Sequence, residues 1–145
     1  MKFRRFLIKP LLVLLLCFLG ACSGNSSGEP SRNNSDLAAS PVPQRITAET
    51  AYQMMRESGG FILLDVRTLA EFRERHIAGA ILIPHTEIAA RSASELPDKN
   101  SMIFVYCRTG VRSANAARTL AGMGYLQVFD FGGIVDWPFG TVRGD

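Results

Sequence analysis

The sequence predicts an α/β protein in which a parallel sheet is flanked by helices within a single domain. Short apolar runs of β-forming residues alternate along the chain with segments of helical pattern, which is typical of parallel sheets. The part expected to fold, residues 44–145, suits one domain with one core. Four strands are expected, at residues 61–64, 80–83, 102–106 and 127–129.

Two helices are expected before the middle of the chain. The first runs from residue 48 to about residue 56, behind Thr47 as its N-cap, and ends before the glycine pair at 59–60. Thr68 and Glu71 have the spacing of a capping box. A second helix is therefore expected to begin at Thr68.

Two more helices are expected in the second half. A short helix near residues 87–90 precedes a loop at 95–100 that is rich in Ser, Pro and Asp. An alanine-rich segment with a glycine stop predicts a longer helix at 113–124.

Residues 1–21 have the charge and apolar pattern of a secretory signal peptide. Four basic side chains precede the apolar run 11–19; they are Lys2, Arg4, Arg5 and Lys9. This run is shorter than the ~20 residues of a membrane-spanning helix. Removal of the segment is therefore expected, rather than anchoring as a helix.

Residues 19–22, Leu-Gly-Ala-Cys, resemble a bacterial lipobox, whose cysteine becomes the lipidated first residue of the mature protein. The resemblance implies an acyl anchor such as palmitate on Cys22, and a lipoprotein of the bacterial cell envelope that faces the periplasm. Ser23 stands where an aspartate would indicate inner-membrane retention, which favours the outer membrane. The alternative is an ordinary signal peptide cleaved nearby, with Cys22 incidental.

Residues 22–43 are polar and rich in Gly, Ser and Pro, with few apolar side chains to bury. Such a composition predicts a flexible tether between the anchor and the domain. The folded domain is accordingly expected at 44–145.

The basic charge of the chain comes from its amino terminus. Sixteen Lys and Arg stand against thirteen Asp and Glu, a net charge of +3. Four of the basic residues and none of the acidic ones lie in residues 1–21, so the rest of the chain carries twelve basic and thirteen acidic side chains, a net −1. The charge therefore gives no support for binding to nucleic acid.

Cys107 is the only thiol expected in the folded part, because Cys17 would leave with the signal peptide and Cys22 would be lipidated. An internal disulfide is then impossible, and an unpaired cysteine in an oxidising compartment is a liability unless it is buried or used. The sequence has neither a metal-binding spacing of Cys and His nor a Gly-rich nucleotide loop, so no metal or cofactor is predicted.

The segment 106–113, Tyr-Cys-Arg-Thr-Gly-Val-Arg-Ser, has the composition of an activated thiol site. Cys107 follows a predicted strand at its carboxyl end, where open α/β sheets place ligands. Backbone amides at the start of the next helix, together with Arg108 and Arg112, are expected to lower the pKa of the thiol and favour the thiolate. The alternative is a buried, inert cysteine that packs as a small apolar residue.

Several separated motifs, in order from Ile46 onward, resemble the rhodanese (sulfurtransferase) family. They are Leu-Asp-Val-Arg at 64–67, Glu-Phe at 71–72, His-Ile-Ala-Gly-Ala at 76–80 leading to Ile-Pro at 83–84, Cys-Arg-Thr-Gly-Val-Arg-Ser at 107–113, and Gly-Gly at 132–133 with Trp137. The sequence departs from the family at Leu82, where an asparagine is frequent. Only eight residues follow Trp137, so a last helix should be short or absent.

The resemblance implies a rhodanese-like fold and a sulfurtransferase. The Cys107 thiolate would attack the outer sulfur of a donor such as thiosulfate, release sulfite and become a persulfide. A thiol, cyanide or an acceptor protein would then take the sulfur, with no cofactor beyond this covalent sulfur.

The rest of the loop is expected to bind the substrate; its residues are Arg108, Thr109, Gly110, Val111, Arg112 and Ser113. Both arginines can pair with the sulfonate oxygens of the donor, the loop amides can stabilise the persulfide, and Gly110 lets the loop turn tightly. Arg112 can also tie the loop to neighbouring carbonyls. The alternative for Arg108 is a solvated surface arginine.

Asp65 and Arg67 are interpreted as hydrogen-bonded supports of the strand-to-loop geometry rather than as an acid and base pair. Attack of an ionised thiol on a soft sulfur needs little proton transfer, so His76 is expected to be structural and His85 to lie in a surface loop. Trp137 is expected to belong to the core or to cover the loop.

Two other functions stay open. Phosphatases and arsenate reductases related to rhodanese share the fold and the Cys-to-Arg anion cradle, but here Cys107 and Arg112 enclose four residues where the phosphatases enclose five, and Tyr106 stands where they usually have histidine. A persulfide carrier or docking module for a protein partner is the second alternative. The sequence leaves the physiological donor, the acceptor and the oligomeric state open.

Overall fold

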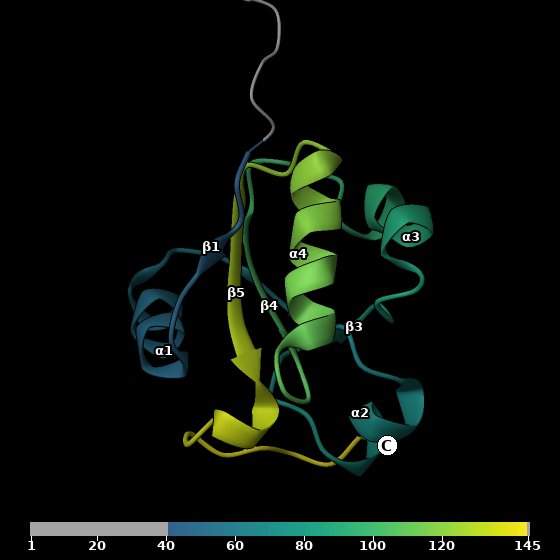
Figure 1. Cartoon of the computed structure of the whole chain (residues 1–145). Helices are drawn as coiled ribbons and strands as arrows, with labels where there is room; N and C mark the ends of the chain where they lie inside the picture. Colours follow the sequence, from purple (N-terminus) through teal and green to yellow (C-terminus); the bar gives the residue numbers. More distant parts are fainter. Residues whose placement is uncertain (1–40, 145) are drawn as a thin grey trace, which may run out of the picture. The chain divides into compact units, whose positions relative to one another are not determined.

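The computed structural model describes residues 41–144, so the expectations for the signal peptide, for Cys22 and for most of the tether lie outside the described residues. Five strands form one parallel sheet in the order β1-β5-β4-β2-β3 (Figure 1). The strands are β1 Gln44–Arg45, β2 Ile62–Asp65, β3 Ile81–Leu82, β4 Met102–Cys107 and β5 Gln127–Gly133. The predicted α/β class with a parallel sheet is confirmed.

Helices cover both faces of the sheet (Figure 1). Helix α1, Ala48–Glu57, covers one face, and α3, Ile88–Glu95, and α4, Val111–Gly122, cover the other. Helix α2, Leu69–Glu74, lies beyond the carboxyl ends of the strands. After β5 the chain forms a 3-10 turn, η1 Ile134–Asp136. Among the described residues that follow Trp137, 138–144, there is no helix. No helix within residues 41–144 has both the length and the apolar character needed to cross a bilayer.

The central strand β4 separates two halves of the core. Successive side chains of a strand point to opposite faces. Phe104 and Tyr106 therefore pack on the α1 side, whereas Ile103, Val105 and Cys107 pack on the α3 and α4 side. All five are buried. The predicted nucleophile thus belongs to the half of the core that α4 covers.

The two predicted N-caps, Thr47 and Thr68, are confirmed. Thr47 caps α1, and its Oγ1 accepts a hydrogen bond from the backbone N–H of Thr50 at 3.1 Å. Thr68 and Glu71 form the reciprocal capping box of α2, in which the Glu71 amide donates to Thr68 Oγ1 and the Thr68 amide donates to Glu71 Oε2.

Several element boundaries differ from the predictions. Helix α4 begins at Val111 instead of residue 113, because Gly110 adopts a left-handed conformation with φ 103° and serves as the N-cap. Helix α3 continues to Glu95, because Ser92 and Leu96 are buried against the core. Strand β5 continues to Gly133 past an irregularity in its pairing with β4. Strand β1 was not predicted, since two residues carry no periodic signal.

Candidate active site

Cys107 is the last residue of β4 and is 1% exposed. The next three residues turn the chain into α4, and the backbone N–H of Gly110 donates a hydrogen bond to Cys107 Sγ at 3.1 Å. This geometry depends on the left-handed φ of Gly110, which other residues rarely adopt. The turn therefore directs an amide, with its partial positive charge, at the sulfur.

The environment of Cys107 favours the thiolate. Burial by itself would raise the pKa of the thiol. Hydrogen bonds from the backbone and hydroxyl of Ser113 and from the amides of Gly110 and Thr109 outweigh burial, so the pKa lies below its ordinary value. An inert cysteine would also be buried. Cys107 differs because the loop around it donates hydrogen bonds that stabilise the negative charge of the thiolate.

Ser113 ties the loop to the end of β5. Its hydroxyl lies within hydrogen-bond distance of two carbonyl oxygens, that of Gly110 at 3.0 Å and that of Gly132 at 3.3 Å. Ser113 is fully buried. It therefore holds the first turn of α4, the Cys107 loop and β5 together.

Arg112 is paired with Glu71 of α2. Its two terminal nitrogens donate to the two carboxylate oxygens at 2.8 and 2.7 Å, a bidentate ion pair. The hydrogen bonds from Arg112 lower the pKa of Glu71 to about 2, and the same hydrogen bonds raise the pKa of Arg112. The negative charge of Cys107 adds to the rise at Arg112. Arg112 was expected to contact the donor or neighbouring carbonyls, and the partner in the structure is a carboxylate.

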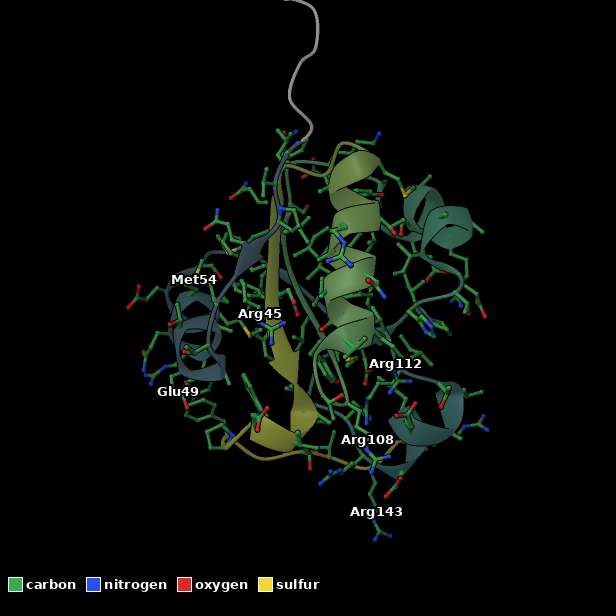
Figure 2. All side chains as sticks on the ribbon, viewed as in Figure 1. Arg45, Glu49, Met54, Arg108, Arg112 and Arg143 are labelled. Carbon is green, nitrogen blue, oxygen red and sulfur yellow. The ribbon has the colours of Figure 1, made fainter. Side chains whose placement is uncertain are left out.

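Arg108 is exposed at the mouth of the site. A polar crevice of about 110 Å³ lies beside it; the crevice is lined by Arg67, Glu71, Glu74, Arg75, Arg108 and Ile134. Figure 2 shows Arg108 and Arg112 at the end of the domain where α2 lies. Thr109 and Val111 are also exposed. The loop therefore offers one arginine held by a carboxylate and one open to solvent.

Asp65 and Arg67 form a buried ion pair at the end of β2, with exposed side-chain fractions of 0% and 3%. Arg67 donates from Nε and Nη2 to the carboxylate, and Nη2 also donates to the backbone carbonyl of Arg75 at 2.6 Å. Burial lowers the pKa of Arg67, but the hydrogen bonds and charge of Asp65 outweigh it, so the pKa is raised. The pair connects β2 to the segment after α2.

The remaining predicted residues lie around this frame. His76 Nδ1 donates to the carbonyl of Phe72 at 3.0 Å, and its ring stacks on the Phe72 ring. His85 is exposed in a loop. Trp137 is buried, and its indole N–H donates to the carbonyl of Gly140.

Two residues of the site had no predicted role. The hydroxyl of Tyr106 accepts the backbone N–H of Ile77 at 3.1 Å, inside the core. Gly133 is packed so closely that a Cβ there would lie 2.5 Å from the carbonyl oxygen of Arg108. The glycine pair at 132–133 was noticed as a motif, whereas no sequence signal indicated the contact of Tyr106.

The arrangement can stabilise negative charge on one sulfur atom and on a small anion next to it. The sulfur accepts amide hydrogen bonds, and Arg108 and Arg112 supply positive charge at the same end of the sheet. Across residues 41–144 no group of three or more Cys, His, Asp or Glu side chains is placed to hold a metal ion.

A family model described as "Rhodanese-like domain" matches residues 47–138. Among characterised proteins, the chain is 40% identical over 81 residues to "Thiosulfate sulfurtransferase PspE" of Escherichia coli, which covers 56% of this chain and 78% of that protein. It is 36% identical over 111 residues to "Putative sulfur carrier protein YrkF" of Bacillus subtilis, covering 76% of this chain and 56% of that protein. The chain thus spans little more than half the length of YrkF.

Solved structures agree in fold. A rhodanese from Escherichia coli, described with anions, superimposes with a TM-score of 0.56 at 38% identity and covers 59% of this chain and 100% of that chain. A rhodanese-like domain protein from Staphylococcus aureus gives a TM-score of 0.61 at 29% identity, covering 70% of this chain and 99% of that chain.

Proposed function

Since the chain belongs to the family of rhodanese-like domains, we propose that it moves a sulfane sulfur from thiosulfate or a related donor to a thiophilic acceptor through a persulfide on Cys107. The named relatives support a role as a sulfurtransferase or sulfur carrier.

One observation carries the proposal. The only cysteine between residues 41 and 144 lies at the carboxyl end of the central strand, accepts the Gly110 amide at 3.1 Å, and has a lowered pKa. A thiolate is the reactive form of cysteine, and a lowered pKa keeps it available at neutral pH.

The reaction has two displacements. In the first, the Cys107 thiolate attacks the outer sulfur of thiosulfate, the S–S bond of the donor breaks, and its electron pair leaves with sulfite. In the second, an acceptor anion such as cyanide or a thiolate attacks the outer sulfur of the Cys107 persulfide, and the thiolate is regenerated. No net oxidation occurs and no proton transfer is needed at the sulfur.

The thiolate and thiosulfate are both anions, so the site must offset their repulsion. We assign the first contact with the sulfonate oxygens to Arg108, which is exposed beside the crevice and has no carboxylate partner within the described residues. The charge of Arg112 is largely balanced by Glu71, so its role is to hold the loop and attract the anion at longer range. The amides from Arg108 to Ser113 stabilise the persulfide once it forms.

The intact mass of the domain after treatment with thiosulfate tests the proposal. The wild type should gain the mass of one sulfur atom, and cyanide should remove it and yield thiocyanate. Cys107→Ser should show neither change. Absence of the gain in a folded wild type would contradict sulfur transfer through Cys107, and turnover of a phosphate ester would then support the phosphatase alternative.

The relative named as a sulfur carrier favours a second candidate, in which the persulfide is held for one protein partner. The exposed fraction of Cys107, only 1%, restricts access to the sulfur. Turnover with glutathione, cysteine and cyanide separates the two roles. Fast turnover with small thiols indicates an enzyme, whereas persulfide that resists them and is discharged by a protein from the same cell indicates a carrier.

We also propose that the domain is held at the bacterial cell envelope by an acyl group on Cys22, facing the periplasm and preferentially at the outer membrane. The basic and apolar pattern of residues 1–21, the Leu-Gly-Ala-Cys ending and the polar segment 22–43 support this proposal. Labelled palmitate should be incorporated into the wild type and into Cys107→Ser but not into Cys22→Ala. Equal labelling of all three would reject the anchor.

A further inference from the structure

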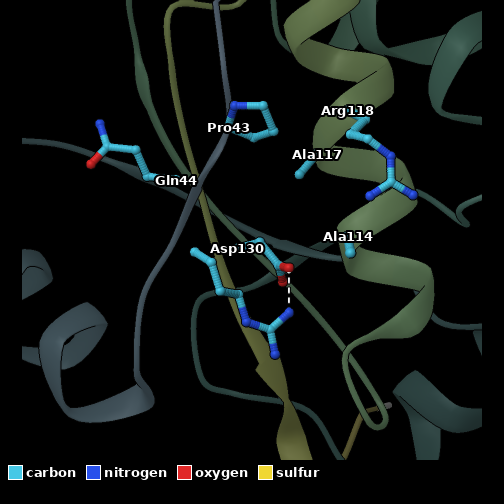
Figure 3. Close-up of a pocket in the computed structure, with 7 residues that line it drawn as sticks. Pro43, Gln44, Ala114, Ala117, Arg118 and Asp130 are labelled. Carbon is cyan, nitrogen blue, oxygen red and sulfur yellow. Dashed lines mark hydrogen bonds and ion pairs between the residues drawn. The ribbon is translucent and has the colours of Figure 1, made fainter.

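An ion pair between β1 and β5 lies next to the Cys107 loop. Arg45 of β1 donates from Nη1 to Asp130 Oδ2 of β5 at 2.5 Å (Figure 3). The Asp130 side chain is 5% exposed, whereas that of Arg45 is 58% exposed. A buried carboxylate needs a partner, and here an edge strand supplies it.

The second oxygen of Asp130 holds a bulge at the end of β5. In the pairing of β4 with β5, Val105 is opposite Asp130 but Tyr106 is opposite Gly132, so Phe131 is an extra residue. Asp130 Oδ1 accepts the backbone N–H of Gly132 at 3.0 Å, across the bulge. The carboxylate therefore connects β1 to the segment that contacts the loop.

The guanidinium of Arg45 also packs against the loop itself. A Cβ placed on Gly132 would lie 2.7 Å from Arg45 Nη2, and one placed on Gly110 would lie 3.0 Å from the same nitrogen. Arg45 thus lies in van der Waals reach of one glycine in the bulge and of the glycine whose amide binds Cys107 Sγ.

Two sets of contacts connect the Arg45–Asp130 pair to the Cys107 loop. One passes from Asp130 through Gly132 to the hydroxyl of Ser113 and so to Gly110. The other is the direct packing of Arg45 on Gly110. We propose that Arg45 and Asp130 are positioning residues, which fix the conformation of the Cys107 loop and so sustain the reactivity of the nucleophile. The inference rests on the proposed function for the identity of that nucleophile.

Arg45 precedes the segment that the family model matches, residues 47–138, so the pair couples a residue outside the family match to one inside it. Arg118 provides a matched control. It lines the same hollow as Arg45 and Asp130 (Figure 3). Its guanidinium, however, donates to Asn115 on its own helix.

The test measures the rate at which iodoacetamide alkylates Cys107 as a function of pH, in the wild type and in Arg45→Gln, Asp130→Ala and Arg118→Gln. Loosening the loop misaligns the amides that stabilise the thiolate. Both Arg45→Gln and Asp130→Ala should therefore shift the profile to higher pH and slow alkylation at neutral pH, by roughly threefold or more. Arg118→Gln should match the wild type.

The direction in which each variant shifts the pH profile distinguishes a positioning role from a direct electrostatic effect of the two charges on Cys107. If the pair acted only through its field, loss of the Asp130 charge would shift the profile to lower pH and loss of the Arg45 charge to higher pH. Opposite shifts, or shifts no larger than that of Arg118→Gln, would overturn the inference. The other charged groups around the site, Arg108, Arg112, Glu71, Arg67 and Asp65, are unchanged in all these variants.

Two further measurements keep the test decisive. Circular dichroism checks that each variant is folded. If Asp130→Ala does not fold, Asp130→Asn, which keeps an oxygen for the Gly132 amide but loses the charge, should shift the profile to higher pH, as Arg45→Gln does. Alkylation needs no sulfur donor. A wild type that forms no persulfide would therefore reject the proposed function, while the shifts of the variants would still decide on the positioning pair.

Discussion

Cys107 is buried, yet the pKa of its thiol is lowered, because the hydrogen bonds that stabilise its thiolate come from its own loop and from the first turn of α4. Solvent contributes little at an exposed fraction of 1%. The reactivity of the thiol therefore depends on the backbone conformation of a few residues, above all the left-handed Gly110. Residues that touch the loop from any side can influence the chemistry without contacting a substrate.

At the same scale, we predict that Arg67→Ala lowers the free energy of unfolding by about 3–5 kcal/mol, because it leaves the buried carboxylate of Asp65 without its partner. Unfolding in urea measures this loss. Arg91→Ala is the control, since Arg91 pairs with Glu87 and Glu95 at the surface, where an ion pair contributes little to stability. Equal losses in the two variants would contradict the prediction.

Gly133 provides a second prediction. Its φ of −113° suits any residue, so Gly133→Ala is opposed by the contacts of the new Cβ with the backbone of the loop, 2.5 Å from the carbonyl oxygen of Arg108 and 2.9 Å from the Cα of Thr109. We expect a loss of about 1–3 kcal/mol in the free energy of unfolding, because the loop must move. A slower alkylation of Cys107 at neutral pH should accompany it.

The control for Gly133 is Gly122→Ala at the end of α4, where nothing lies within 4 Å of the new Cβ. This change should stabilise the protein by about 0.4–1 kcal/mol, chiefly by restricting the unfolded chain. If Gly133→Ala did not lower the free energy of unfolding either, the close packing of β5 on the loop would not be needed for stability.

Among the elements, α2 combines helix capping with support of the site. Glu71 closes the capping box with Thr68 and pairs with Arg112 of α4. One side chain thus starts a helix and joins that helix to the loop after β4. The short α2, which has no buried residue, is held largely by these polar contacts.

The pKa of Glu71 predicts a pH dependence of stability. It is about 2 in the folded protein against an ordinary 4.5, so Glu71 stabilises the fold above about pH 4.5, and this contribution is lost as the pH falls to about 2. Glu71→Gln keeps an oxygen for the capping box but lacks the charge. Thermal unfolding at a series of pH values should show the variant less stable above pH 4.5 and the difference vanishing near pH 2. A difference that does not change with pH would be the contrary result.

The sequence predicted correctly those features that depend on residues close together in the chain. The capping box at Thr68, the cap at Thr47 and the strand that leads to Cys107 all depend on residues close together in the chain. The pairing of Arg112 with Glu71, and that of Arg45 with Asp130, join residues 41 and 85 positions apart. Such pairs follow from the packing of whole elements, which no spacing in one sequence reveals.

For the whole molecule, the sheet divides the core of the described domain into two halves. The site lies at the carboxyl end of β4, the strand whose side chains pack into both halves. Tyr106 anchors the α1 side through its bond to Ile77, and Cys107 belongs to the other side. The rigidity of the loop therefore derives from both faces of the sheet together.

The role of β1 gives a prediction at this scale. A chain that starts at residue 41 keeps β1, whereas a chain that starts at residue 47 lacks it and leaves Asp130 buried without Arg45. The shorter chain should unfold at a lower temperature and scatter more light after concentration. Identical melting and scattering would show that β1 is dispensable.

Both outer strands of the sheet, β1 and β3, are only two residues long. A long, unpaired outer strand is a template on which another chain can add a strand of its own, the first step of aggregation. Each outer strand of the described domain offers only two residues to such pairing. Crowded copies of it are thereby protected against joining sheet to sheet, even though the interior strands are as apolar as those that form fibrils.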